Sequence, residues 1–224
     1  MKILIVAALD KEIDILNDLL IAKKKMNYHY KEMGKNEIYT SIVGVGTLNA
    51  LTNTQSLIDE INPDFVINIG TAGSYVLEVN DGDIVVCDEA IYHGGYILTN
   101  SPSSDWETLK ETNLSIKGDK KLSKLLDKID TGCAIYHGKT LSGDFFTKDL
   151  KTITALTEKY HLLCEDMETL AIYKACEIKK IPCIAYRIIS NNELKGTSYE
   201  DNVLIVNKKL QKVIFDLLKH LDSL

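Results

Sequence analysis

The chain has 224 residues, of which 45% are hydrophobic, enough for a single domain to bury a sizeable core. Its formal net charge is -6, and its 26 lysine and arginine residues are scattered along the sequence. Proteins that bind nucleic acid concentrate basic residues in a stripe, so this pattern excludes nucleic acid as the partner. The apolar run from Ile3 to Leu9 is too short for a signal-peptide core or a membrane span, which predicts a cytoplasmic protein without a membrane partner.

The five cysteines are odd in number and show neither C-x-x-C pairing nor metal-ligand spacing with the five histidines. This pattern predicts reduced, mostly buried thiols. Since no metal-ligand spacing is present, we expect no metal site. We expect no organic cofactor either.

Two strand-turn-helix units open the chain. Residues 2–8 form a continuous apolar run, as expected of a strand buried on both faces, and Asp10 can cap the helix that follows. The second unit has a strand over 38–43 and a helix that ends before Pro63, since proline cannot continue a helix. Residues 65–69 then predict a third buried strand.

The rest of the chain continues this alternation. Residues 84–90 predict a strand, while 94–118 are polar and lack sustained periodicity, which indicates a long excursion near the functional site or at a subunit contact. Further strands are predicted over 134–141 and 182–189, and helices over 150–157, 168–180 and 203–221. The alternation predicts a layered α/β domain in which helices flank a largely parallel or mixed sheet.

Three carboxylates and a methionine lie between an apolar strand and an amphipathic helix, in the segment 164–171 (CEDMETLA). In open α/β folds, ligands bind at the sheet edge where such junctions lie. The helix dipole also favours acidic residues in a first turn, so a solvated helix start explains this segment alone equally well.

Small and hydroxyl-bearing residues follow the third strand directly, in the segment 70–74 (GTAGS). A backbone without large side chains lets a ligand approach closely. The segment matches neither G-x-G-x-x-G nor the P-loop pattern, so it fits a plain turn at least as well as a ligand-binding loop.

Arg187 is the only arginine of the chain, and it stands at the end of an apolar strand. Burying an unpaired guanidinium is costly, so this side chain needs a carboxylate partner from a neighbouring strand end. Glu12 and Glu168 are the candidates.

Two of the four phenylalanines, Phe145 and Phe146, follow the strand over 134–141. One of them could stack on a planar ring, although two adjacent aromatics belong to a core more often. His93 and His137 each follow a tyrosine in a similar strand-end context, and we expect each to be a hydrogen-bonded structural residue.

In this order and at this spacing, the motifs together resemble the purine nucleoside phosphorylase and nucleosidase superfamily, specifically its methylthioadenosine/S-adenosylhomocysteine nucleosidase branch. The best-matching segments are 1–12, 63–73, 82–86, 142–146, 166–168 and 187–190. The resemblance implies one domain over 1–224 with a three-layer α/β/α phosphorylase/hydrolase-like fold and a central mixed sheet. It also implies a homodimer in which part of 94–118 closes the neighbour's site.

The resemblance assigns roles at the sugar. Glu12 would activate the attacking water and Arg187 would orient it, while Glu168 would hold the ribose 2′ and 3′ hydroxyls beside Met167. Cleavage of an N-glycosidic bond passes through an oxocarbenium-like sugar, so nearby anions, a water held by a base and a donor to the leaving base all make physical sense.

The resemblance also assigns contacts to the rest of the substrate. Phe146 would stack on the purine, the backbone at Thr147 would read its edge, and Thr71 would line the junction of ribose and base. The remaining residues of the expected substrate site are Ala72, Gly73, Asp166 and Ser190.

Asn191 departs from the nucleosidase pattern. After Arg-x-x-Ser the nucleosidases carry an aspartate, which protonates N7 and accepts from the 6-amino group. A carboxamide cannot give up a proton, but it can donate to a 6-oxo group while accepting from N7-H, as 6-oxopurine members of the superfamily are understood to do. The sugar site therefore fits an adenine nucleosidase, whereas Asn191 favours a 6-oxopurine nucleoside.

The sequence thus predicts an enzyme that hydrolyses a purine nucleoside to free base and ribose moiety. A 6-oxopurine nucleosidase such as a futalosine hydrolase, or a purine nucleoside phosphorylase, is the alternative. Phosphorolysis is disfavoured because phosphate binding needs bidentate cations and the lone Arg187 is engaged elsewhere. A degenerate protein that binds a nucleoside without turnover is the alternative of a different class.

Overall fold

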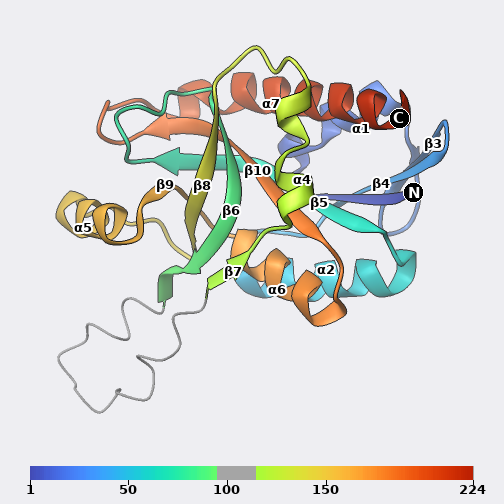
Figure 1. Cartoon of the computed structure of the whole chain (residues 1–224), viewed down its shortest axis with the longest axis horizontal. Helices are drawn as coiled ribbons and strands as arrows, with labels where there is room; N and C mark the ends of the chain where they lie inside the picture. Colours follow the sequence, from blue (N-terminus) through green and yellow to red (C-terminus); the bar gives the residue numbers. More distant parts are fainter. Residues whose placement is uncertain (95–114, 224) are drawn as a thin grey trace.

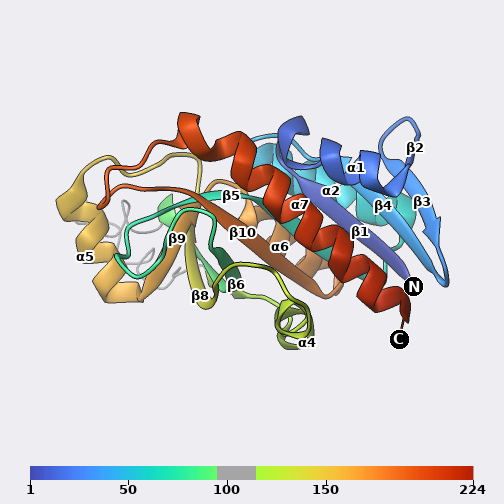
Figure 2. The same ribbon diagram turned by 90° about the horizontal axis from the view of Figure 1, so that it is seen from above.

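The computed structural model describes residues 1–94 and 115–223. A central sheet lies between two helical layers, with α1 (Asp14–Leu20) and α7 (Tyr199–Ser223) on one side and α2 (Thr47–Ile61) and α6 (Thr169–Lys179) on the other (Figure 1, Figure 2). The predicted three-layer α/β arrangement is confirmed. The other described helical elements are the 3₁₀ turns η1 (Asp10–Glu12) and η3 (Leu126–Lys128), α4 (Lys120–Ser123) and α5 (Leu150–Tyr160).

The sheet is mixed and partly closed. Its main strands are β1 (Lys2–Ala7), β4 (Asn36–Ile42), β5 (Phe65–Ser74), β6 (Ile84–Tyr92), β8 (Ile135–Ser142), β9 (Leu162–Asp166) and β10 (Cys183–Asn192). β1 runs parallel to β4 and β5, and β5 to β10, whereas β6 is antiparallel to β10. Because β9 pairs back to β5, strands β5, β10, β6, β8 and β9 form a closed series of pairings. This closure brings the ends of distant strands together.

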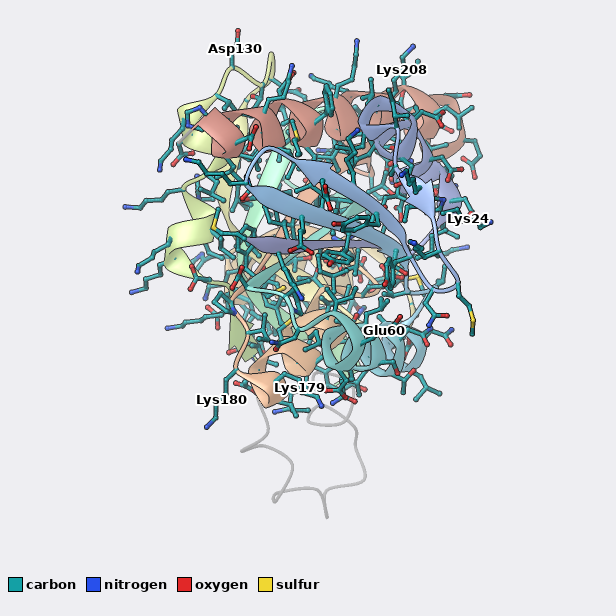
Figure 3. All side chains as sticks on the ribbon, turned by 90° about the vertical axis from the view of Figure 1, so that its right-hand side faces the viewer. Lys24, Glu60, Asp130, Lys179, Lys180 and Lys208 are labelled. Carbon is teal, nitrogen blue, oxygen red and sulfur yellow. The ribbon has the colours of Figure 1, made fainter. Side chains whose placement is uncertain are left out.

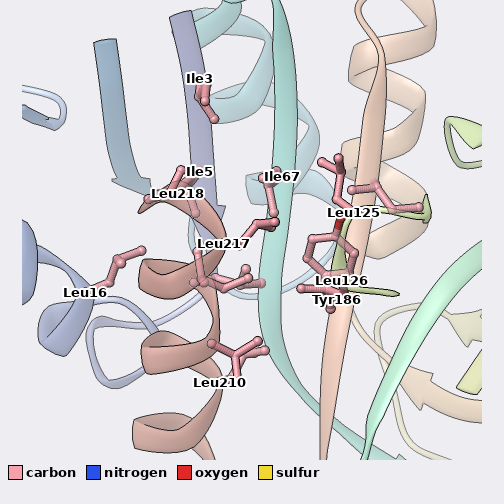
Figure 4. Packing of buried hydrophobic residues seen from close by; sticks show 14 of the residues in the cluster. Ile3, Ile5, Leu16, Ile67, Leu125, Leu126, Tyr186, Leu210, Leu217 and Leu218 are labelled. Atoms are coloured by element: carbon pink, nitrogen blue, oxygen red, sulfur yellow. The ribbon is translucent and has the colours of Figure 1, made fainter. Parts of the chain in front are cut away.

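The apolar run of the first strand is explained by burial on both faces. Ile3, Ile5 and Ala7 pack on the side of α1 and α7, whereas Leu4 and Val6 pack on the side of α2 and α6. Figure 4 shows the first of these faces, where leucines of α7 lie against side chains of the central strands. A strand covered on both faces has no polar alternation, as the sequence indicated.

An edge hairpin lies outside the predicted elements. It consists of β2 (Lys23–Lys24) and β3 (His29–Met33), and β3 pairs with β4. Its residues are exposed or half-buried, so they lack the apolar run by which the other strands were identified.

The segment 70–74 continues β5 instead of forming the predicted loop. Gly70 pairs with Arg187 of β10 and Gly73 with Asn191. Because the residues of this segment are small, neighbouring side chains can lie close to this part of the strand. The predicted excursion over 94–118 falls largely outside the described residues, and at its end β7 (Ser115–Lys117) pairs with β6.

Charged side chains cover the outside of the molecule. Figure 3 shows Lys24, Glu60, Asp130 and Lys208 pointing away from the layered interior. Among the described helices, none combines the length and apolar character needed to cross a membrane. All five cysteines carry free thiols, and every one except Cys133 is buried, as predicted.

Candidate functional site

A cavity of about 540 Å³ is enclosed by the ends of β1, β5 and β10 and by the segments that follow β8 and β9. Its volume lies in the usual range for small-molecule sites. Of the predicted site residues, all but Arg187 and Asp166 line it: Glu12, Thr71, Ala72, Gly73, Phe146, Thr147, Met167, Glu168, Ser190 and Asn191. The fold thus brings together residues that are up to 179 positions apart, since Glu12 and Asn191 share one cavity.

The Glu12 carboxylate is fixed by four donors. Its Oε2 accepts from the backbone N–H groups of Ala8 and Leu9, both at 3.1 Å. Its Oε1 accepts from the Thr71 backbone N–H at 3.1 Å and from the Thr71 hydroxyl at 3.2 Å. A carboxylate has about four acceptor positions, so all are filled. Only the Thr71 hydroxyl can rotate away, and its position on Oε1 is the one that a water can take.

Arg187 is buried behind the cavity and is held by Thr169 and two carboxylates. Its Nε and Nη2 donate to the Thr169 hydroxyl at 3.0 and 2.9 Å. Its Nη2 lies 3.9 Å from Glu168 Oε2, and its Nε lies 3.6 Å from Asp166 Oδ2. The predicted pairing with Glu168 is confirmed, and Asp166 is a second partner that the sequence did not indicate.

Gly70 makes room for two functional side chains. A Cβ atom at this position would lie 2.2 Å from Arg187 Nη1 and 3.1 Å from Glu12 Oε1. Arg187 therefore approaches Glu12 across the bare backbone of Gly70. Arg187 does not line the cavity, so its orienting of a water stays a prediction, in which it would act through Glu12 and Glu168.

Asp166 lies beneath the cavity and supports the start of α6. Its Oδ1 accepts from the backbone N–H groups of Glu168 and Thr169 at 2.9 and 2.8 Å, and its Oδ2 accepts from the Thr140 hydroxyl at 2.8 Å. Burial by itself raises the pKa of Asp166, but Arg187 and these hydrogen bonds lower the pKa more strongly, so the group stays ionised. Because protein donors occupy both oxygens, Asp166 does not have the predicted position of a direct substrate contact.

Glu168 faces the cavity at the start of α6, beside Met167. Its Oε1 accepts from the Gly46 backbone N–H at 3.1 Å. Burial raises its pKa to about 7 against the opposing effect of Arg187, and Asp166 and Glu12 raise it as well. Glu168 therefore changes charge in the neutral pH range.

Asn191 and Phe146 line the other side of the site. Asn191 Oδ1 accepts from the Ser190 hydroxyl at 2.9 Å, and its Nδ2 donates to Glu193 Oε1 at 2.8 Å. Phe146 is 47% exposed and lines the cavity, so its ring has a free surface. That it stacks on a purine stays a prediction.

The backbone of Thr147 is already engaged. Its N–H donates to the buried carboxylate of Glu165 at 3.2 Å, and its C=O accepts from the Tyr75 hydroxyl at 3.1 Å. The predicted reading of the purine edge by this backbone would require the N–H to leave Glu165, whereas the C=O has a second lone pair for another donor. His93 Nε2 is hydrogen-bonded to the Thr147 hydroxyl at 2.9 Å, so this histidine is hydrogen-bonded as expected, and its structural role stays a prediction.

Several cavity residues lie outside the predicted set: Ala8, Leu9, Val45, Tyr75, Lys148, Glu193, Tyr199 and Glu200. A signal existed for Glu193, because it stands two positions after Asn191 and alternate residues of an extended strand end share a side. The others come from turns and helix starts without a distinctive pattern. Within residues 1–94 and 115–223, no group of three or more histidine, cysteine or acidic residues could hold a metal ion.

A model of the phosphorylase superfamily matches residues 2–221. The chain belongs to the phosphorylase superfamily. Two relatives of this chain are 5'-methylthioadenosine/S-adenosylhomocysteine nucleosidases. The protein from Buchnera aphidicola is 30% identical over 100% of this chain and 98% of its own, and that from Maridesulfovibrio salexigens is 27% identical over 99% of this chain and 100% of its own. These relatives agree with the resemblance found in the motifs.

Solved structures show the same superfamily fold. The 5'-methylthioadenosine/S-adenosylhomocysteine nucleosidase of Helicobacter pylori with butyl-thio-DADMe-Immucillin-A has a TM-score of 0.86, at 21% identity and 98% coverage of both chains. The futalosine hydrolase of H. pylori has a TM-score of 0.85, at 19% identity and the same coverage. Since both give nearly the same TM-score, the fold does not distinguish the base.

The raised pKa of Glu168 gives this superfamily member an expected pH profile. Only the ionised carboxylate is a full acceptor for sugar hydroxyls and a counter-charge for a cationic sugar, so kcat/KM should fall about tenfold per unit as the pH drops below about 7. Glu168→Gln should give a lower kcat/KM that does not show this fall below about pH 7. Steady-state rates from pH 5 to 9 measure both profiles, and a wild-type kcat/KM that stays flat between pH 5.5 and 8 would contradict the assignment.

Gly70→Ala should disable the site through displacement of Arg187 and Glu12. The added Cβ cannot coexist with both side chains, and a misplacement of about 1 Å can cost about 10²-fold in rate. We therefore expect kcat/KM to fall at least about 100-fold. Gly132→Ala is the control: its Cβ would enter open space at a φ of +62°, so it should lose only about 1 kcal/mol of stability while retaining its rate. Equal effects of the two variants on kcat/KM would refute this account of Gly70.

Proposed function

We propose that the protein is an enzyme that hydrolyses the N-glycosidic bond of a purine nucleoside, as a nucleosidase of the methylthioadenosine/S-adenosylhomocysteine type. The observation that carries the proposal is the carboxylate of Glu12, anchored at the cavity beside Glu168. The nucleosidase relatives that match the whole chain support it.

The geometry accounts for a hydrolytic step. A water that replaces the Thr71 hydroxyl on Glu12 Oε1 transfers a proton to this carboxylate as its oxygen attacks C1′. The C1′–N9 bond breaks, and its electron pair leaves with the base. Glu168 and Glu12 supply negative charge near the cationic sugar, and Asn191 offers an N–H to the base. Arg187 keeps Glu168 in place from behind.

Water is favoured over phosphate as the nucleophile. A phosphate nucleophile needs bidentate cationic donors. Arg187, the only arginine of the chain, is buried and engaged with Thr169, Asp166 and Glu168. No described arginine is therefore left to bind phosphate in the cavity.

A 6-oxopurine nucleosidase is the second candidate. It is favoured by Asn191, which places an amide where adenine nucleosidases are expected to have a carboxyl group. A nucleoside-binding protein without turnover remains the candidate of another class.

One panel tests these functions. Adenosine, methylthioadenosine, adenosylhomocysteine, inosine and futalosine are each incubated with the protein, with and without phosphate, and the free base is measured. We expect base and free ribose moiety at a rate independent of phosphate. Accumulation of ribose 1-phosphate would overturn hydrolysis, and ligand binding without release of any base would identify the binding protein.

We also propose that the protein is a cytoplasmic homodimer and that it takes part in methionine salvage. Free thiols at all five cysteines are consistent with a reducing compartment. The relatives' names support the salvage role, since methylthioadenosine retains the methyl-sulfur group of methionine. Light scattering of the purified chain measures its mass in solution, and a monomer mass would overturn the dimer.

A further inference from the structure

The residue that faces Asn191 at the cavity is itself a carboxylate. Glu193 lines the cavity, and its Oε1 accepts from Asn191 Nδ2 at 2.8 Å. An ionised carboxylate only accepts, so this contact turns the amide nitrogen of Asn191 toward Glu193. The Ser190 hydroxyl, at 2.9 Å from Asn191 Oδ1, stabilises the same orientation from the other end.

The backbone holds Glu193 firmly in this place. Its N–H donates to the Ser74 carbonyl at 3.1 Å, which ties it to the end of β5. The preceding Asn192 is fully buried, and its Nδ2 donates to the carbonyls of Val76 and Val79 at 2.8 and 2.9 Å. Glu193 therefore follows an anchored strand end and is not carried on a free loop.

Part of the hydrogen-bonding capacity of this pair is available to a ligand. The Asn191 amide has two N–H groups, of which one is used on Glu193. Within residues 1–94 and 115–223, the Glu193 side chain has no other hydrogen bond, so its Oε2 can accept one more. Burial and Glu165 raise the pKa of the cavity residue Tyr75, and Glu193 adds to this rise, which places its negative charge close to the same part of the cavity.

We infer that Glu193 determines the base that the enzyme accepts. Its carboxylate receives a hydrogen bond from the 6-amino group of an adenine base while Asn191 donates its second N–H to N7. Two side chains thus supply the acceptor and the donor that one aspartic acid would otherwise combine. This inference rests on the proposed nucleosidase function and predicts a preference for 6-amino over 6-oxo purines, opposite to the expectation from Asn191 alone.

Glu193→Gln tests the inference with little change in shape. The introduced carboxamide must use its oxygen to accept from Asn191, so its NH₂ group faces the base. A donor at this point opposes the 6-amino group and suits a 6-oxo group. Methylthioadenosine and methylthioinosine differ only in the group at position 6 and the accompanying proton on N1, and the ratio of their kcat/KM values is the measurement. We expect a native ratio of at least about 10 in favour of methylthioadenosine, and a fall of about 10–100-fold in Glu193→Gln.

Glu78→Gln is the matched control. It removes the same charge from an exposed glutamate that does not line the cavity, and it should leave the ratio within twofold. Inhibition by the free bases adenine and hypoxanthine gives a second measurement, independent of turnover, that should change in the same direction.

The outcomes separate the inference from the proposed function. A native enzyme that prefers methylthioinosine, or a Glu193→Gln variant whose kinetic and inhibition ratios match the native values, overturns the inference while hydrolysis stands. If the native protein releases no base from any nucleoside, the proposed function itself is overturned.

Discussion

Glu12→Gln should lower kcat by about 10²–10⁴-fold while the substrate still binds with near-native affinity. A carboxamide retains the size of the side chain but cannot take a proton from water. Four donors fix the native carboxylate, so the variant must place its NH₂ group against one of them. We therefore also expect a loss of about 1–3 kcal/mol in the free energy of unfolding. Single-turnover rates, equilibrium binding and thermal unfolding measure the three quantities separately.

Two further variants are compared with Glu12→Gln, one as a control and one with a different expected effect. Asp10→Asn neutralises an exposed acid two positions away and should keep the native kcat. Glu168→Gln should weaken both binding and turnover, because in the proposed mechanism its carboxylate would contact the sugar before and during the reaction. If Glu12→Gln loses affinity by as much as it loses rate, Glu12 shapes the site without acting as the base, and wild-type turnover would remove it from the mechanism.

The sequence allowed prediction of the cavity residues that stand where a strand ends. Glu12, Thr71, Glu168 and Asn191 each follow an apolar run closely, and the ends of such runs meet at one edge of a sheet. These residues lie together because the sheet brings the strand ends together, and the alternation of apolar runs and helical patterns predicted such a sheet.

Whether a side chain lines the cavity or lies buried behind it could not be predicted in the same way. Asp166 ends β9 and Arg187 lies in the middle of β10, yet the side chains of both lie behind the cavity. Which face of a closed, twisted sheet a side chain takes depends on the register of its strand against its neighbours. That register pairs Gly70 with Arg187, and the missing side chain of Gly70 lets Arg187 approach Glu12. A segment of small residues alone could not distinguish this strand from a loop.

Arg187→Met should be the most destabilising of the substitutions considered, because it leaves Asp166 and Glu168 buried without their cation. Removing one partner of a buried ion pair typically lowers the free energy of unfolding by about 3–5 kcal/mol, and we expect a loss in this range at pH 8. Lys174→Met, which breaks the exposed pair with Glu177, should lose less than about 1 kcal/mol.

The effect of Arg187→Met should also depend on pH through Glu168. Arg187 lowers the pKa of this carboxyl group, so its removal should raise the pKa further above about 7. A carboxyl group with a raised pKa in the folded state favours folding below its unfolded pKa of about 4.3, and this contribution is lost as the pH rises through the folded value. The variant should therefore be less destabilised at pH 5 than at pH 8, and combining it with Glu168→Gln should recover part of the loss at pH 8. Denaturant unfolding of the single and double variants at both pH values measures this, and equal losses at pH 5 and pH 8 would show that Arg187 stabilises the fold without reference to the charge of Glu168.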